Sequence, residues 1–211
     1  MFEKLIKNLK KYNIKDIIKM EEKDRQFLAI KQLYKNIKNS NYFLPLIITN
    51  ALLGYQLSSK GENYWEEFCY EVLNFNFKKD FSVFEIEEFF KNFLPKSKGN
   101  KRLLNIKISR IKKILLFLDE FIGKEEIYYE NILQFQEVLA KFMKQKNDAK
   151  TIVFSIKMFH YGARLKFKKF IPIPFEIAIP IDSRIKKLTK KYNNLGLSTK
   201  DFWFFVSKKV S

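Results

Sequence analysis

Apolar side chains recur every three or four residues along most of the 211-residue chain, a spacing that places them on one face of an α-helix. Two clear stripes lie within residues 2–9 and 27–37. The same spacing predicts further helices over residues 43–57, 62–77, 82–94, 102–122, 126–145, 149–169, 183–193 and 199–209. A chain of this length forms one domain or two small lobes around one core. The predicted fold class is therefore all-α, with residues 1–211 as a single unit.

Several residues mark where these helices begin and end. Ser82 with Glu85 predicts a capping box, and Ser198 with Asp201 resembles a second one. Gly123 predicts the end of the long helix before it, because glycine readily adopts the left-handed conformation that closes a helix. No repeat or low-complexity linker interrupts this series of helices.

The chain carries 41 Lys and Arg residues against 23 Asp and Glu residues, a formal net charge of +18. An excess of this size predicts affinity for a polyanion such as nucleic acid or an anionic membrane surface. Of the basic residues 36 are Lys and 5 are Arg, a choice that an AT-rich genome would also favour through its codons. Codon use therefore stays as an alternative explanation of the charge.

A single Cys and a single His exclude several chemistries within this chain. Disulfide frameworks, four-Cys iron–sulfur clusters, Cys/His zinc sites and His-pair metal sites all need more of these residues. We therefore predict no metal and no cofactor. Cys69 lies in an apolar run and is predicted to be a buried small hydrophobe, and His160 is predicted to be structural. Glycine-rich loops of the kind that hold nucleotide phosphates are absent from the sequence.

No segment predicts export or insertion into a membrane. The first twelve residues carry charges throughout and lack the apolar stretch of a signal peptide. The longest apolar stretch, residues 42–53, is shorter than the roughly 20 residues that a membrane-spanning helix needs. We therefore expect a soluble, cytoplasmic protein with no membrane partner.

The segment from Phe170 to Asp182 departs from the helical spacing. It holds three of the five prolines, and each proline fixes its own φ and biases the preceding residue towards an extended conformation. We expect a rigid, extended, largely apolar connection. Asp182 ends it just before a helical stretch, where a carboxylate caps the first amides of the helix.

The helix predicted over residues 149–169 has an unusual first turn. Asp148 is a good N-cap, and Lys150 follows in the first turn, where the helix dipole disfavours an ammonium group and favours the neutral amine of a nucleophile. Lys150, Phe154 and Lys157 follow at i, i+4 and i+7 and therefore share one helix face. The alternative is a solvated lysine in a lysine-rich chain.

The runs AKTIVFSIKMFHY (149–161) and PFEIAIPIDSRIKKLT (174–189) resemble the archaeal 8-oxoguanine DNA glycosylases, also called archaeal GO glycosylases. This family is a divergent branch of the helix-hairpin-helix glycosylase superfamily. Lys150 and Asp182 lie 32 residues apart, which is the separation that the family shows. The resemblance covers nearly the whole chain, because it extends to residues 24–30, 49–68 and 196–206.

The resemblance implies two helical lobes with the active site in the cleft between them. It also implies excision of 8-oxoguanine from DNA with an associated β-lyase step. Lys150 corresponds to the nucleophile that forms a Schiff base with the sugar, and Asp182 to the essential carboxylate. The implied partners are double- and single-stranded DNA that contains 8-oxoguanine, bound by a monomeric, nucleoid-associated enzyme.

By the same resemblance, six residues correspond to the family's pocket for the flipped base: Gln26, Trp65, Phe154, Lys157, Asp201 and Phe205. Their chemistry suits this task, since rings stack on a base, an indole N–H donates, and a carboxylate accepts from the guanine N1–H and N2–H groups. Phe205 is a departure, because the family has a stacking Trp at this position. Trp203 lies two residues earlier, so the ring that stacks on the base stays open.

The glycine-rich hairpin that grips a DNA phosphate in the wider superfamily is not evident before Lys150. The corresponding turn reads KQKND (144–148). Contacts to the DNA backbone would then rest on the helix N-terminus, on the basic run 96–102 and on Lys141, Lys144 and Lys146.

Two other classes of protein remain as alternatives. In a non-catalytic helical nucleic-acid-binding protein, Lys150 is one more phosphate contact and Asp182 one more cap. In a peripheral membrane or scaffold protein, the charge alone supplies the attachment. Formation of a Schiff base distinguishes the glycosylase from both.

Overall fold

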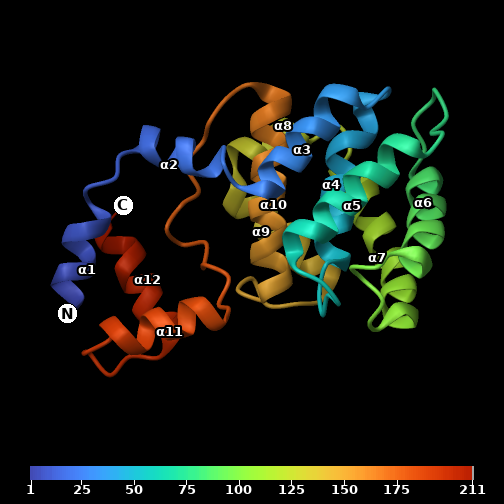
Figure 1. The fold of residues 1–211 in the computed structure, drawn as a ribbon. Coiled ribbons are helices and arrows are strands. Elements are labelled where there is room, and N and C mark those ends of the chain that lie inside the picture. Colours follow the sequence, from blue (N-terminus) through green and yellow to red (C-terminus); the bar gives the residue numbers. More distant parts are fainter. Residues whose placement is uncertain (211) are drawn as a thin grey trace. The chain divides into compact units, whose positions relative to one another are not determined.

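The computed structural model describes residues 1–210, and every regular element among them is helical (Figure 1). The prediction of an all-α fold is confirmed. In chain order the elements are α1 (Phe2–Leu9), α2 (Ile14–Glu21), α3 (Arg25–Asn36), the 3-10 turn η1 (Ser40–Tyr42), α4 (Phe43–Leu53), α5 (Gly61–Asn74), α6 (Val83–Lys96), α7 (Leu104–Phe121), α8 (Glu125–Glu130), α9 (Ile132–Met143), α10 (Lys150–Phe167), α11 (Ser183–Tyr192) and α12 (Thr199–Val210).

Helix α2 is not among the helices predicted above, although Ile14, Ile17 and Ile18 follow the helical spacing over its eight residues. None of its residues is buried. A reciprocal capping box holds its start instead: Asp16 N–H donates to Asn13 Oδ1, and Asn13 N–H donates to Asp16 Oδ2, both at 3.0 Å.

The prediction of one continuous helix over residues 126–145 is wrong. The chain breaks at Asn131, whose φ of −120° and ψ of 71° lie outside the helical region. The Asn131 side chain accepts from the backbone N–H of Gln134 at 3.3 Å and so caps α9. Asparagine prefers such a cap to a helix interior, and this preference overrides the apolar stripe.

The predicted caps are borne out in part. Ser82 caps α6 by accepting from the backbone N–H of Phe84, but Glu85 accepts from Lys78 N–H instead of closing a box. Gly123, with a φ of +82°, follows the end of α7.

Residues 23–171 form a compact unit built around α4. All eleven residues of α4 are buried, and α10 packs along it more extensively than any other helix does (Figure 1). Gly162 permits this close approach, because a Cβ there would lie 2.8 Å from Leu44 Cδ2 of α4. Helices α3, α7, α8 and α9 pack against this pair, and α5 packs on α3.

The two unusual side chains of the sequence lie inside this unit. Cys69 is 5% exposed, as predicted for a buried small hydrophobe. His160 is 1% exposed, and its Nε2 lies 2.6 Å from the carbonyl oxygen of Ile171. Burial lowers the pKa of His160, which favours a neutral imidazole with a packing role.

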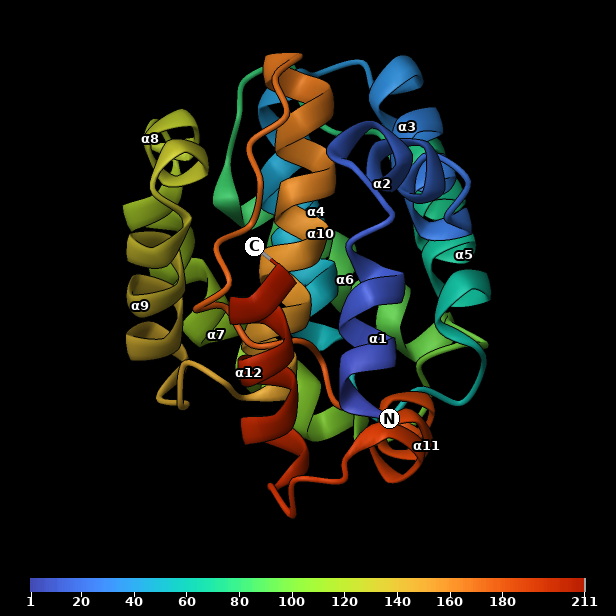
Figure 2. The ribbon, with the colours of Figure 1, turned by 90° about the vertical axis from the view of Figure 1, so that its left-hand side faces the viewer.

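Residues 1–22 and 172–211 make up the second compact unit, of which the structure describes all but the last residue. The first and last helices of the chain, α1 and α12, lie side by side in it (Figure 2). A small core holds them together: Phe2, Leu5, Ile6, Phe202 and Val206.

Helix α11 joins this second unit through α12. The Trp203 indole N–H donates to Thr189 Oγ1 at 2.8 Å. Among residues 1–210 no helix combines the length and the apolar character that crossing a bilayer requires.

Candidate active site

Lys150 is the first residue of α10, and its side chain is exposed. The first-turn position predicted for it is therefore confirmed, whereas the prediction of Asp148 as N-cap is wrong. The N-cap is Ala149, which makes no side-chain cap hydrogen bond. The helix starts one residue later than the sequence predicts because residues 146–149 form a turn, closed by the Ala149 N–H to Lys146 carbonyl bond at 2.9 Å.

Helix α10 is continuous over 18 residues, so Lys150, Phe154 and Lys157 lie along one face of it. The opposite face enters the core, as predicted, with four fully buried side chains: Ile152, Ile156, Phe159 and Ala163. The core therefore fixes the direction in which the Lys150 face points.

The amine of Lys157 is held by Asp24, a residue that the sequence analysis did not single out. Lys157 Nζ lies 3.1 Å from Asp24 Oδ2, and Tyr161 OH donates to the same oxygen at 3.0 Å. Burial alone would raise the pKa of Asp24, but the Lys157 charge and the hydrogen bonds to the carboxylate outweigh it and lower the pKa. An ionised Asp24 therefore ties α10 to the start of α3.

The other oxygen of Asp24 positions Gln26. Asp24 is the N-cap of α3, and its Oδ1 accepts from the backbone N–H of Gln26 at 2.9 Å. The Gln26 side chain is 9% exposed and lies against the start of α5, since a Cβ on Gly61 would come within 3.1 Å of Gln26 Nε2. One carboxylate thus connects two of the predicted base-pocket residues, Gln26 and Lys157.

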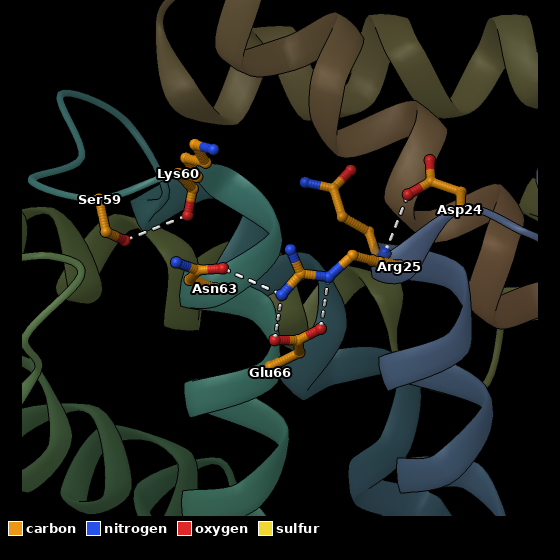
Figure 3. A network of polar contacts seen from close by, with 7 residues as sticks. Asp24, Arg25, Ser59, Lys60, Asn63 and Glu66 are labelled. Atoms are coloured by element: carbon orange, nitrogen blue, oxygen red, sulfur yellow. Dashed lines mark hydrogen bonds and ion pairs between the residues drawn. The ribbon is translucent and has the colours of Figure 1, made fainter.

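A second ion pair, made by Arg25 and Glu66, fastens α3 to α5 (Figure 3). The Arg25 guanidinium makes two bonds to the Glu66 carboxylate, at 2.9 and 2.6 Å, and a third to Asn63 Oδ1 at 3.0 Å. A bidentate arginine–carboxylate pair has a defined geometry, so it fixes the register of the two helices.

Trp65 of α5 and Phe154 of α10 lie next to each other within the unit formed by residues 23–171. Their ring centroids are 6.5 Å apart with an interplanar angle of 59°. Trp65 is 1% exposed and also packs edge-on against Phe68 at 5.6 Å. The predicted pocket residues Gln26, Trp65, Phe154 and Lys157 therefore come from three helices that pack on one another.

Asp182 caps α11, as predicted. Its Oδ1 accepts from the backbone N–H of Ile185 at 2.9 Å, and its Oδ2 lies 3.1 Å from Arg184 Nε. The hydrogen bond from Ile185 is the main cause of a lowered pKa for Asp182, with a smaller contribution from Arg184. The carboxylate therefore stays ionised at neutral pH.

Asp201 and Phe205 lie on α12, in the same compact unit as Asp182. The Asp201 carboxylate accepts from Ser198 Oγ at 2.6 Å, and its backbone N–H donates to the same hydroxyl oxygen at 3.2 Å. Phe205 is 37% exposed and packs on Phe2 at 5.5 Å. Trp203 is half-buried and its indole N–H is bonded to Thr189, so Phe205 is the more exposed of the two rings.

The hairpin between α9 and α10 forms without glycine. Lys144 adopts the left-handed conformation, with a φ of 51°. Its N–H bonds to the carbonyl of Lys141, and the N–H of Gln145 bonds to that of Ala140, the pattern of a Schellman motif. The side chains of Lys141, Lys144 and Lys146 are exposed on and beside this hairpin.

The structure is therefore all-helical among its described residues, and a hairpin between α9 and α10 leads directly into the exposed Lys150. The family model AGOG, described as N-glycosylase/DNA lyase, matches residues 6–203. The chain therefore belongs to the N-glycosylase/DNA lyase family.

Curated relatives bear the same description. The N-glycosylase/DNA lyase of Methanococcus maripaludis is 40% identical over 191 residues, which cover 90% of this chain and 73% of the relative. That of Nanoarchaeum equitans is also 40% identical, over 212 residues that cover 100% of this chain and 85% of the relative.

A solved structure has the same fold. It is the 8-oxoguanine DNA glycosylase from Pyrobaculum aerophilum in complex with 8-oxoguanosine, and it superposes with a TM-score of 0.81 at 20% sequence identity. The superposition covers 99% of this chain and 81% of the solved one.

Asp24 offers a test of how the candidate site is held together. Asp24→Ala removes both the helix cap and the partner of Lys157, so it should lower the free energy of unfolding by about 1–3 kcal/mol. Asp24→Asn keeps a cap but loses the charge, and it should cost less. Urea unfolding measures both changes, and Asp16→Asn in the exposed cap of α2 is the matched control.

The lowered pKa of Asp24 also predicts how the free energy of unfolding depends on pH. Because the pKa of Asp24 is lowered in the folded protein, its stabilisation is fully present above the unfolded value of 3.8 and is lost as pH falls through the folded value. Asp24→Asn should remove this part of the acid destabilisation. If the wild type and Asp24→Asn lose stability in parallel below pH 4, Asp24 does not hold this site.

Proposed function

We propose that this chain excises 8-oxoguanine from DNA and cleaves the resulting abasic site, with the amine of Lys150 as the nucleophile. The observation that carries the proposal is the position of Lys150, exposed at the first residue of α10 directly after the hairpin. Membership of the N-glycosylase/DNA lyase family supports both steps. The choice of 8-oxoguanine as the excised base is supported by the similar Pyrobaculum aerophilum enzyme, an 8-oxoguanine DNA glycosylase in complex with 8-oxoguanosine.

The proposed chemistry starts from the neutral amine. Lys150 Nζ attacks C1′ of the damaged nucleotide, the bond from C1′ to the base breaks, and the base leaves with the electron pair and takes up a proton. The amine loses a proton, and opening of the sugar ring gives a Schiff base between Nζ and C1′. Loss of a C2′ proton then expels the 3′-phosphate, and water hydrolyses the Schiff base to regenerate Lys150.

Asp182 is proposed as the second catalytic group. A negative charge stabilises the oxocarbenium character that develops at C1′ while the base departs, and a carboxylate can also assist proton transfer. Its lowered pKa supports this assignment, because only the ionised form supplies the charge. The cap bond to Ile185 fixes one oxygen of the carboxylate, so capping and catalysis are compatible roles.

Recognition of the base is assigned to the six residues that the resemblance implies. Gln26 and Trp65 would provide hydrogen bonds, Lys157 a cation and Asp201 an acceptor, while Phe154 and Phe205 stack on the base. The neighbouring positions of Gln26, Trp65, Phe154 and Lys157 within residues 23–171 support a shared task. The Asp24 contacts to Lys157 and to the Gln26 backbone support pre-organisation of this pocket.

The proposed substrate is 8-oxoguanine in double- or single-stranded DNA, bound by a monomer. A flipped base is identified inside a pocket, so its recognition does not require a paired strand. The exposed Lys141, Lys144 and Lys146 would contact phosphates near the hairpin. The net charge of +18 supports a polyanionic partner and nucleoid association.

Replacement of the nucleophile tests the first assignment. Lys150→Gln should abolish both release of 8-oxoguanine and covalent trapping with borohydride, because no amine remains at the start of α10. The fold should survive, since the side chain is exposed. Lys35→Gln, at an exposed position in the last turn of α3, is the matched control and should behave as wild type.

Wild-type trapping by Lys150→Gln would refute the assignment and make Lys157 the next candidate. A wild-type protein that binds DNA but neither traps nor releases the base would be the non-catalytic nucleic-acid-binding protein of the alternative reading.

Replacement of the carboxylate tests the second assignment. Asp182→Asn keeps a side-chain oxygen for the cap, so the melting temperature should change little, while excision should slow by about 100-fold or more. Single-turnover excision and thermal unfolding measure the two effects. If the melting temperature falls sharply and excision stays intact, only the cap role of Asp182 survives.

A further inference from the structure

The side chain of Gln145 links the hairpin before Lys150 to α7 and to α10. Gln145 Oε1 accepts from Arg110 Nη2 of α7 at 2.8 Å and from Thr151 Oγ1 of α10 at 2.9 Å. A second contact lies nearby, because the buried Gln136 of α9 donates through Nε2 to the carbonyl oxygen of Asn147 at 2.9 Å. The hairpin is therefore attached to α7, α9 and α10 by side chains.

These bonds hold the start of α10 through the Thr151 hydroxyl and the Asn147 carbonyl, and not through the first amides as a helix cap does. Ala149 occupies the N-cap and has no side-chain acceptor for the first amides of the helix. Thr151 follows Lys150 directly, and its hydroxyl is held by Gln145. The backbone from which Lys150 projects is thus fixed by the residue after it.

We propose that Gln145 is a positioning residue for Lys150. Its side-chain oxygen ties Thr151 in the first turn of α10 to Arg110 of α7, and so sets where the lysine side chain begins. The inference rests on the proposed function, in which Lys150 is the nucleophile. We assign Gln145 no contact with the substrate.

The flexibility of the lysine side chain explains why the Gln145 bonds matter for the amine of Lys150. A lysine side chain has four flexible carbons, so the location of Nζ is only as well defined as the backbone that carries it. A bond from a guanidinium is stronger than one between neutral groups, and Arg110 therefore provides a firm anchor. A displacement of about 1 Å in a reacting group can cost about 100-fold in rate.

The test compares three variants with the wild type. Gln145→Met removes the acceptor and keeps the size of the side chain, whereas Gln145→Glu keeps an acceptor for both Arg110 and Thr151. Gln134→Met is the matched control, because Gln134 is an exposed glutamine of the neighbouring helix α9. The readouts are the borohydride trapping rate on a preformed abasic site, the affinity for DNA with a tetrahydrofuran abasic analogue, and the melting temperature.

We expect Gln145→Met to trap at least about tenfold more slowly than the wild type with its DNA affinity nearly unchanged, whereas the melting temperature should fall modestly because Arg110 loses an acceptor. Gln145→Glu should restore the rate to within about threefold of wild type, and Gln134→Met should not differ from it. Three results would overturn the inference: an unchanged rate in Gln145→Met, a rate loss explained entirely by weaker DNA binding, or no recovery in Gln145→Glu.

Hydrogen exchange separates a failure of this inference from a failure of the proposed nucleophile. Gln145→Met should speed amide exchange over residues 144–151, and Gln134→Met should not, whichever lysine forms the Schiff base. If Lys150→Gln still traps, the proposed function is wrong, and exchange still reports whether Gln145 fixes the hairpin. Unchanged exchange in Gln145→Met would refute the link itself.

Discussion

The packing of α10 on the fully buried helix α4 determines where the candidate active-site residues lie within the unit 23–171. Gly162 allows the two helices to approach closely, because any larger side chain would meet Leu44. The buried face of α10 then leaves one orientation for the opposite face, which carries Lys150, Phe154 and Lys157. Side-chain contacts from α3 and α5 add to this frame.

The Asp24 carboxylate and the Gln145 amide fix this face of α10 at two points. Asp24 holds Lys157 in the middle of the helix and caps α3 with its other oxygen. Gln145 holds Thr151 in the first turn. The proposed nucleophile and base pocket both require defined geometry, and these two contacts hold α10 at its first turn and near its middle.

The features that depend on nearby residues could be predicted from the sequence. The cap formed by Asp182 and the first-turn position of Lys150 involve neighbours within a few residues, so spacing and residue type suffice. The pairing of Lys157 with Asp24 joins residues 133 positions apart, and no local pattern encodes it. Asp24 still had a signal, because an aspartate directly before an apolar stripe predicts a helix cap.

The errors of prediction have an equally local physical cause. Asn131 breaks a helix that the apolar stripe predicts as continuous, because its side chain caps α9. Ala149 takes the place predicted for Asp148, because the hairpin turn continues to that residue.

The bond from Arg110 to Gln145 spans 35 positions and depends on the packing of α7, which the sequence alone does not define.

The identity of the trapped residue tests the central claim most directly, since the chain offers 36 lysines as possible nucleophiles. The wild-type protein is reduced with borohydride on a duplex that contains 8-oxoguanine, digested, and the peptide that carries the nucleotide is sequenced by mass spectrometry. We expect one adduct, on Nζ of Lys150. An adduct on another lysine, or base release with no adduct, would contradict the central claim.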